Sequence, residues 1–166
     1  AISFVAGLLL PYLLAAITRI HAVDNGTYMV LVPFVMAFMS DTFAYFVGCA
    51  IGKHKLAPNI SPNKTIEGMV GGVLGATVGM VAYGLVMQFV FGFTVNYIFA
   101  VIYGILGSVA SVFGDLVFSA IKRQTCIKDY GKFIPGHGGV LDRFDSMVMV
   151  APLAELLLLV LPLAVK

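Results

Sequence analysis

The amino-acid sequence predicts an all-α, polytopic integral membrane protein, and three observations lead to that prediction. Hydrophobic residues make up 60% of the 166 residues and charged residues only 11%, whereas soluble domains carry roughly 25% charged residues. The mean hydropathy is +1.01, so a water-soluble fold of this size could not hide its apolar surface. The apolar runs are also continuous, as membrane helices require, and do not alternate as the strands of a β-barrel do.

Five of these runs are long enough, or nearly so, to cross a bilayer as helices. The chain starts with Ala1 directly in the first run, without the basic stretch or cleavage site of a signal peptide, so we interpret that run as a span. We expect one transmembrane domain over residues 1–166, preceded by further N-terminal helices in the full-length protein. The five expected spans lie at about 2–18, 27–52, 67–91, 97–121 and 144–165.

The distribution of basic residues predicts which ends of the spans face the cytoplasm. The connections 53–66 and 122–143 are separated by two spans and therefore lie on the same side. Only Arg19 and Lys166 lie on the other side, and the positive-inside rule places the two long connections in the cytoplasm. Their basic residues are Lys53, Lys55, Lys64, Lys122, Arg123, Lys128, Lys132 and Arg143.

A glycine repeat in the third expected span predicts close helix packing. Gly71, Gly75 and Gly79 recur every four residues, which places them on one face of a helix. Small residues at this spacing allow a neighbouring helix to approach the backbone. A phosphate-binding loop is excluded, because no Lys-Ser/Thr pair of the Walker type follows the glycines.

Three acidic residues fall inside the expected spans, where a carboxylate is costly unless it has a partner. Asp41 lies near the middle of the second span, Asp115 in the fourth and Glu155 in the fifth. Each carboxylate either forms a buried ion pair or faces a wet cavity. For Glu155, a neighbouring helix or a dimer partner is the expected contact.

The residues around Asp115 predict a cation site at the cytoplasmic end of the helices. Ser111, Asp115 and Ser119 are four residues apart and share one helix face. Asp142 and Asp145 lie three residues apart where the fifth span begins. Such a pair can simply cap a helix N-terminus, but together with Asp115 it forms an oxygen-rich set of the kind that Mg²⁺ binds alongside substrate phosphates.

The last cytoplasmic connection combines these acids with phosphate-binding features. Basic residues near a membrane can simply hold anionic headgroups. This connection, however, also contains the run Pro-Gly-His-Gly-Gly at 135–139, whose glycines allow successive N–H groups to surround an anion. Basic side chains, a glycine-rich turn and carboxylates together favour a metal–polyphosphate complex.

Residues 119–145 closely resemble the signature of the phosphatidate cytidylyltransferase (CDP-diacylglycerol synthase) family. They match the pattern S-x-x-K-R-x4-K-D-x-G-x2-x-P-G-H-G-G-x2-D-R-x-D at every fixed position. A second block, Ser-Pro-Asn-Lys-Thr-Ile-Glu-Gly at 61–68, is similar to another region of that family. Ser61 followed by Pro62 also predicts a helix start, with Ser61 as the N-cap, that directs Lys64 and Glu67 toward the site.

The resemblance implies a Mg²⁺-dependent nucleotidyltransferase of phospholipid biosynthesis that joins CTP to phosphatidic acid, forming CDP-diacylglycerol and pyrophosphate. It implies Asp115, Asp142 and Asp145 as metal ligands, with a second cation possible. Basic residues are expected to bind the triphosphate or the lipid headgroup: Lys64, Lys122, Arg123, Lys128 and Arg143. Further substrate-binding positions are Ser61, Asn63, Thr65, Glu67, Ser119, His137, Gly138 and Gly139, although His137 suits a purely structural turn equally well.

Two other functions remain open at this point. A transporter also carries intramembrane acids, but it would spread them across the membrane depth. A CTP-dependent lipid kinase would use parts of the same substrates. We expect an integral protein of a membrane (the inner or plasma membrane in a bacterium) with its active site on the cytoplasmic face. The expected partners are CTP, phosphatidic acid, membrane lipids and a second copy in a homodimer, and no nucleic acid.

Overall fold

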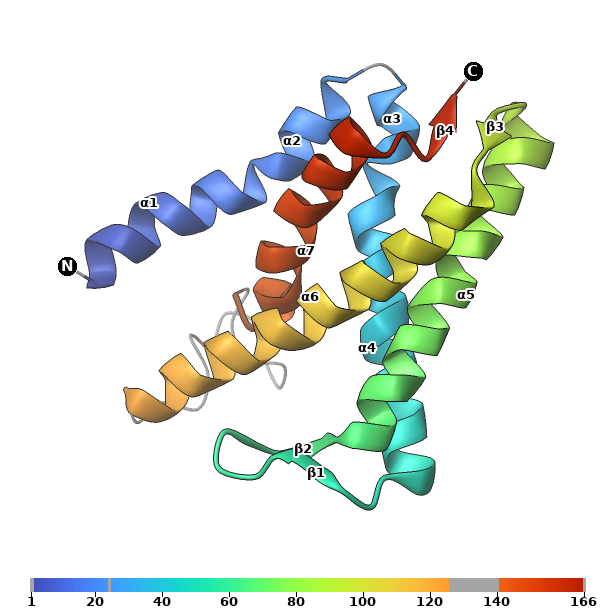
Figure 1. The fold of residues 1–166 in the computed structure, drawn as a ribbon. Helices are drawn as coiled ribbons and strands as arrows, with labels where there is room; N and C mark the ends of the chain where they lie inside the picture. Colours follow the sequence, from blue (N-terminus) through green and yellow to red (C-terminus); the bar gives the residue numbers. More distant parts are fainter. Residues whose placement is uncertain (1, 24, 126–140, 166) are drawn as a thin grey trace.

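The computed structural model describes residues 2–23, 25–125 and 141–165, with the side chains of 2–6 and 141–143 outside that description. Seven helices and four short strands form the described part (Figure 1). The helices are α1 (Ile2–Leu14), α2 (Ala16–His21), α3 (Gly26–Met29), α4 (Leu31–Ile51), α5 (Ile66–Phe91), α6 (Tyr97–Gln124) and α7 (Leu141–Val160). The strands are β1 (Lys55–Ala57), β2 (Ser61–Thr65), β3 (Thr94–Val95) and β4 (Ala164–Val165).

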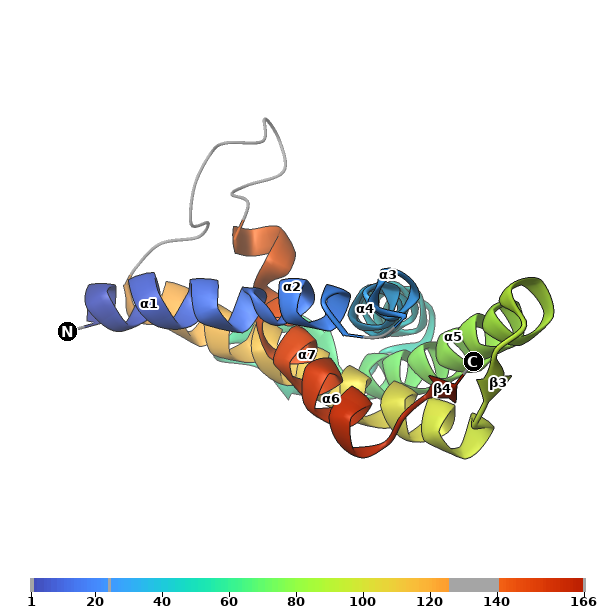
Figure 2. The same ribbon diagram turned by 90° about the horizontal axis from the view of Figure 1, so that it is seen from above.

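Among the described residues, three helical segments are long and apolar enough to cross a membrane. They are Gly26–Ile51, Ile66–Phe91 and Tyr97–Gln124, which coincide with the second, third and fourth expected spans. The expected number of five spans is not confirmed. The first expected span is divided between α1 and α2, which follow each other almost in one line (Figure 2).

The helix of the fifth expected span ends earlier than predicted, and four short strands accompany an otherwise helical fold. The helix of that span, α7, ends at Val160, and Ala164–Val165 then forms β4 instead of continuing to 165. This strand pairs antiparallel with β3, and the hydroxyl of Thr94 donates to the carbonyl of Val165 at 2.8 Å. The physical reason is Pro162, which lacks a backbone N–H and cannot continue a helix.

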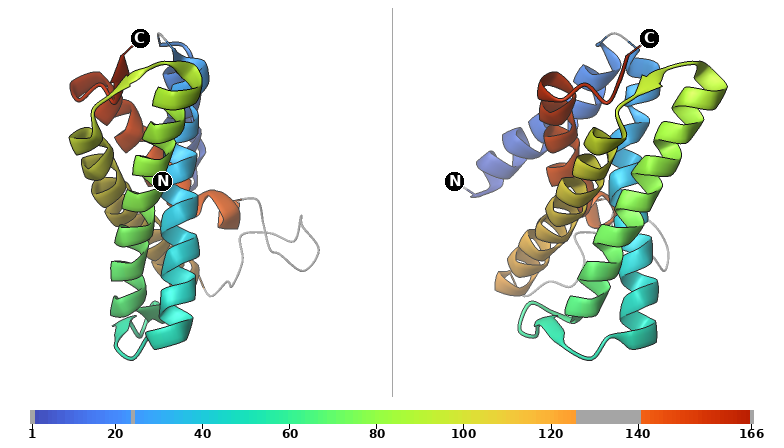
Figure 3. Two further views of the ribbon diagram at one scale, coloured as in Figure 1. Left: turned by 90° about the vertical axis from the view of Figure 1, so that its right-hand side faces the viewer. Right: turned by 45° about the vertical axis from the view of Figure 1, so that its right-hand side comes forward.

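The longest packing interface joins α4 and α5, which run side by side along their length (Figure 3, left). A Cβ atom on Gly71 would lie 2.5 Å from Val47, and one on Gly79 would lie 2.7 Å from Met39. A Cβ atom on Gly75 would overlap the side chain of Phe43. The predicted glycine face is thus confirmed as the surface that admits α4.

Helices α6 and α7 complete the bundle, and α1 and α2 pack against α7. The buried apolar core gathers residues of most helices, among them Met36, Met80, Tyr103 and Val150. The two small sheets lie at opposite ends of the bundle, β1–β2 beside the start of α5 and β3–β4 beside its end (Figure 1). The β1–β2 end is the end that the basic connection 53–66 occupies.

Candidate active site

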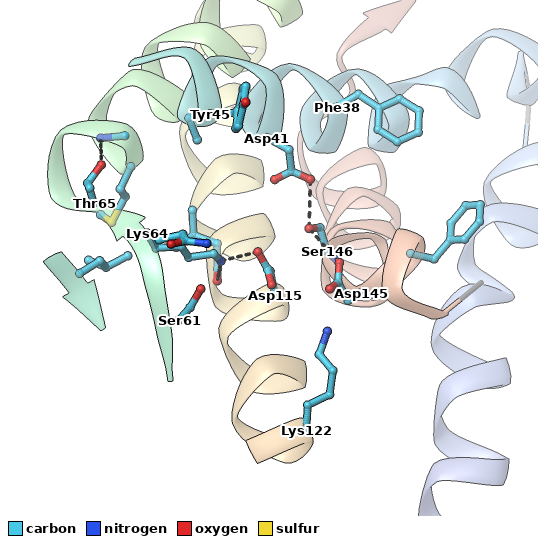
Figure 4. Close-up of a pocket in the computed structure, with 17 residues that line it drawn as sticks. Phe38, Asp41, Tyr45, Ser61, Lys64, Thr65, Asp115, Lys122, Asp145 and Ser146 are labelled. Carbon is cyan, nitrogen blue, oxygen red and sulfur yellow. Dashed lines mark hydrogen bonds and ion pairs between the residues drawn. The ribbon is translucent and has the colours of Figure 1, made fainter. Parts of the chain in front are cut away.

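A cavity of about 780 Å³ opens at the β1–β2 end of the bundle, between α4, the hairpin, α6 and α7 (Figure 4). Its charged lining consists of three carboxylates and two lysines, contributed by four different elements. The rest of the wall is partly apolar and partly made of hydroxyl and amide groups. The lining residues are Phe38, Asp41, Ala44, Tyr45, Leu56, Ser61, Asn63, Lys64, Thr65, Gly68, Met69, Val112, Asp115, Lys122, Phe144, Asp145 and Ser146.

The closest charge pair in the cavity joins the hairpin to α6. The Lys64 Nζ atom lies 2.5 Å from Oδ2 of Asp115, and it lies 3.5 Å from the carbonyl oxygen of Val112. Both side chains of the ion pair are mostly shielded from solvent, with 22% and 31% of their surfaces exposed. The predicted convergence of Lys64 and Asp115 is therefore present in the structure.

The local structure that presents Lys64 differs from the predicted helix start. Residues Ser61–Thr65 form β2, and α5 begins only at Ile66. Thr65, and not Ser61, is the N-cap: its hydroxyl oxygen accepts a hydrogen bond from the N–H of Gly68 at 3.1 Å. Threonine is also a favoured N-cap residue, and Ser61 pairs with Ala57 across the hairpin.

Asp41, which the sequence marked as an intramembrane acid but which was not assigned to the site, also lines the cavity. Its Oδ1 accepts a hydrogen bond from the Ser111 hydroxyl at 2.7 Å, and its Oδ2 accepts one from the Ser146 hydroxyl at 3.1 Å. One carboxylate on α4 therefore joins α6 and α7 at the cavity wall. Its cost inside an apolar span, noted in the sequence, was the signal for a functional role, because an intramembrane acid is functional by default.

The remaining acid, Asp145, is held at the start of α7. Its carboxylate accepts the N–H of Ser146 at 2.8 Å, and only 9% of the residue is exposed. A Cβ atom on Gly114 would lie 2.9 Å from the Asp145 carbonyl oxygen, so this glycine allows α6 and α7 to meet here. Figure 4 shows Lys122 extending from α6 toward the space beside Asp115 and Asp145.

The structure thus brings many of the predicted site residues together. Ser119 adds a hydrogen bond from its hydroxyl to Oδ1 of Asp115, at 3.1 Å, from one turn further along α6. Three predicted substrate contacts are not among the described lining residues: Ser119 itself, Glu67, which binds the segment after α4, and Arg123, which donates to the carbonyl of Ile60 at 3.2 Å. The predicted residues in the wall are Ser61, Asn63, Lys64, Thr65, Asp115, Lys122 and Asp145.

Six predicted positions lie wholly or partly outside the described residues. Lys128, His137, Gly138 and Gly139 lie outside the described residues. Asp142 and Arg143 belong to the first turn of α7, but their side chains lie outside the described part.

Comparison with known proteins identifies the family. Residues 1–161 match the family model described as "Cytidylyltransferase family". The chain belongs to the cytidylyltransferase family. The family resemblance inferred from the two sequence blocks is therefore confirmed.

Curated relatives of this cytidylyltransferase-family chain carry the name phosphatidate cytidylyltransferase. The protein of Staphylococcus haemolyticus (strain JCSC1435) is 43% identical over 136 residues, which are 82% of this chain and 51% of that protein. The protein of Bacillus subtilis (strain 168) is 46% identical over 124 residues, 75% of this chain and 45% of that protein. The chain thus spans about half the length of the curated relatives it matches.

The cavity of this cytidylyltransferase-family chain offers ligands that suit a hard cation. The described residues alone do not form a complete metal site. Carboxylate oxygens are the ligands that Mg²⁺ prefers, and Asp41, Asp115 and Asp145 supply them from three helices. Within the described residues, no three His, Cys, Asp or Glu side chains lie close enough to hold one ion. The predicted metal set therefore depends on Asp142, whose side chain is outside that description.

Proposed function

We propose that the protein containing this chain is a phosphatidate cytidylyltransferase. A phosphate oxygen of phosphatidic acid attacks the α-phosphorus of CTP and forms a new P–O bond. The bond from the α-phosphorus to the bridging oxygen breaks, and pyrophosphate leaves with that electron pair. The products are CDP-diacylglycerol and pyrophosphate. The attacking oxygen is already anionic, so the reaction needs no nucleophilic side chain and no general base.

The observation that best supports this proposal is the charged lining of the cavity. Lys64 and Lys122 come from two different elements, and either lysine can neutralise phosphate oxygens. Asp115 and Asp145 stand beside them and are suited to a cation that accompanies a polyphosphate. The apolar part of the wall, including Phe38 and Met69, suits the lipid portion of the second substrate.

The protein's contribution is then orientation and charge neutralisation, which are the main sources of rate in phosphoryl transfer. The Lys64–Asp115 ion pair holds both groups at the reacting centre before substrate binds. A phosphate that enters the cavity competes with Asp115 for Lys64. Lys64 then has the phosphate as its charge partner, and Asp115 becomes available to the proposed cation. Lys128, Arg123 and Arg143 remain predicted contributors to phosphate binding.

Magnesium is the cation we propose for this site, held by Asp115, Asp142 and Asp145. When bound, Mg²⁺ neutralises phosphate charge and stabilises the leaving pyrophosphate. Asp41 and Ser119 lie next to these ligands. Ser119 donates a hydrogen bond to Asp115, and Asp41 accepts one from Ser146, the neighbour of Asp145. A second cation and a homodimer remain predictions.

We also propose that the cavity faces the cytoplasm. The cavity lies at the end of the bundle where connections 53–66 and 122–143 leave the helices, and these carry eight of the ten basic residues. The positive-inside rule supports a cytoplasmic position for that end. CTP is a cytoplasmic metabolite, so this orientation gives it access to the site.

The proposal is tested with the purified full-length protein, cytidine-labelled CTP, phosphatidic acid and Mg²⁺. We expect cytidine label to enter the lipid phase with release of pyrophosphate, and chelation of Mg²⁺ to abolish the transfer. Asp142→Asn is expected to abolish turnover while the protein still folds. Lys55→Ala is the control, because Lys55 is exposed on β1 and is not among the described residues of the cavity wall.

Other outcomes would contradict the proposal in distinct ways. Transfer of phosphate without cytidine would identify a CTP-dependent lipid kinase. A folded protein that moved a solute across vesicles without turnover would identify a transporter. Near-normal activity of Asp142→Asn would end the assignment of Asp142 to the metal.

A further inference from the structure

The β1–β2 hairpin carries Lys64 into the cavity, yet it has little stability of its own. Its strands contain three and five residues, and their pairing is irregular between Lys55 and Ala57. An isolated two-stranded hairpin is marginally stable at best in water. Contacts outside the hairpin must therefore hold Lys64 in position.

Glu67, in the first turn of α5, makes such contacts at the base of the hairpin. Its carboxylate accepts the backbone N–H of Lys53 at 3.1 Å and that of His54 at 3.2 Å. The same carboxylate lies 2.6 Å from Nδ1 of His54. The N–H of Ile66 donates to the carbonyl of His54 at 2.9 Å. Together these bonds tie the segment that leaves α4 to the segment that enters α5.

A carboxylate suits this position for two physical reasons. Hydrogen bonds to an ionised acceptor are roughly twice as strong as neutral ones. A negative charge in the first turn of a helix is also stabilised by the helix dipole. The Glu67 side chain is 23% exposed, and Glu67 is not among the described residues that line the cavity. Its bonds therefore serve the hairpin and not a molecule inside the cavity.

The hairpin is held at two further points, both on α6. Arg123 donates from Nε to the carbonyl of Ile60, in the turn between the two strands. Lys64, the fourth of the five residues of β2, reaches Asp115. Without the Glu67 contacts, the side-chain contacts that hold the hairpin would be those to α6, at Ile60 and at Lys64 itself.

We infer that Glu67 is a positioning residue that fixes Lys64 beside Asp115 by anchoring the base of the hairpin. The catalytic part of this inference rests on the proposed cytidylyl transfer. Glu67 acts through Lys64 and does not touch the substrate. This role replaces the substrate contact that the family resemblance implied for Glu67, and it explains why Glu67 follows Lys64 at a spacing of three residues across a strand-to-helix boundary.

A double-mutant cycle tests whether Glu67 acts through Lys64. We expect Glu67→Ala to lower kcat/KM by about 10- to 100-fold, the loss that a misplacement of order 1 Å causes. Lys64→Ala is expected to lower it at least as far. The double variant should be no worse than Lys64→Ala alone, because a lysine that is absent cannot be misplaced. Glu67→Gln, which keeps one acceptor oxygen, should fall between Glu67→Ala and the wild type.

Amide hydrogen exchange supplies a readout that does not depend on turnover. In Glu67→Ala we expect faster exchange across residues 53–65 and unchanged exchange in the middle of α5 and α6. His54→Ala keeps both backbone hydrogen bonds to Glu67 and should raise exchange less. Lys55→Ala is the control for a charge lost from the same hairpin, and it should leave both exchange and kcat/KM near those of the wild type.

Two results would overturn the inference. One is a loss in the double variant equal to the product of the two single losses, since independent effects mean that Glu67 does not act through Lys64. The other is unchanged exchange at 53–65 in Glu67→Ala. If the wild-type protein transferred no cytidine, the proposed function would fail, and the exchange result alone would decide the positioning role.

Discussion

Asp41 shows how one side chain can join three helices at a polar site inside an apolar bundle. It lies on α4, and its two carboxylate oxygens receive hydroxyl hydrogen bonds from α6 and α7. Ser146, one of those donors, also donates its backbone N–H to Asp145. The carboxylate of Asp41 therefore restrains the residue next to a proposed metal ligand.

This connection makes Asp41→Asn a sharp test at the residue scale. The amide keeps the size of the side chain but can accept only at one oxygen, so one serine loses its acceptor. We expect kcat to fall about 10- to 100-fold, as when outer-shell partners of metal ligands are removed. The measurement is steady-state cytidylyl transfer as a function of Mg²⁺ concentration.

Ser111 offers the matched pair of variants for that test. Ser111→Ala removes the hydroxyl that donates to Asp41, whereas Ser111→Thr retains a hydroxyl in the same place. We expect the alanine variant to lose activity in the direction of Asp41→Asn and the threonine variant to lose less. Equal effects of the two substitutions would mean that packing, and not the hydrogen bond, matters here.

Lys122 tests phosphate binding at the same scale. Its side chain lines the cavity beside Asp145, so Lys122→Ala removes a positive charge from the proposed phosphate site. We expect a higher apparent KM for one of the two substrates, measured with the other substrate saturating. An unchanged KM for both substrates would move Lys122 to a structural role.

At the scale of elements, the glycine face of α5 sets how closely α4 can approach. Ser40 of α4 also shares a buried hydroxyl hydrogen bond of 2.7 Å with Ser108 of α6, so α4 is held on two sides. Without side chains at Gly71, Gly75 and Gly79, Phe43 and its neighbours lie directly on the α5 backbone. The position of Asp41 in the cavity depends on this packing, since Asp41 and Phe43 belong to the same turn of α4.

Gly75→Val tests that interface. The Cβ atom would overlap the Cβ and ring base of Phe43, which cannot swing away as the far end of a side chain could. We expect a loss of about 1–3 kcal/mol in the free energy of unfolding, as in other overpacked cores. The measurement is unfolding in mixed detergent micelles. Gly7→Ala is the control, because a Cβ at Gly7 meets nothing within 4 Å.

At the scale of the whole molecule, a second charge pair joins the N-terminal helices to α7, away from the cavity. The Arg19 guanidinium contacts both carboxylate oxygens of Glu155, at 2.6 and 2.8 Å, and lies 4.7 Å from the centre of the Tyr12 ring. The expectation that Glu155 faces a neighbouring helix is confirmed. Planar, bidentate geometry of this kind is specific to arginine.

Exchange of the two charges tests this link. Arg19→Glu and Glu155→Arg each place like charges together, and we expect each to lower the Tm of the purified protein. The double variant restores opposite charges and should regain most of the loss, on the order of 1 kcal/mol for a partly exposed pair. A double variant as unstable as the sum of the single variants would show that the pair does not link the helices.

Much of this protein could be predicted from local sequence features. Continuous apolar runs located the helical segments Gly26–Ile51, Ile66–Phe91 and Tyr97–Gln124 within a few residues, because hydrophobicity and helix period are properties of neighbouring residues. The spaced polar pattern of 119–145 identified the family, and the glycine repeat identified the packed face. Charges inside apolar runs marked Asp115, and the signature marked Asp145.

Only the tertiary structure decided which distant groups meet. The Lys64–Asp115 pair, the Asp41–Ser146 hydrogen bond and the Arg19–Glu155 pair join residues 51, 105 and 136 positions apart. Sequence alone also favoured Ser61 over Thr65 as the cap of α5, whereas the structure has Thr65 there. The residue that caps α5 depended on pairing across the hairpin, and the contacts of Glu67 depended on the chain segment that leaves α4. Such contacts follow from how helices cross and pack, and no local pattern specifies those relations.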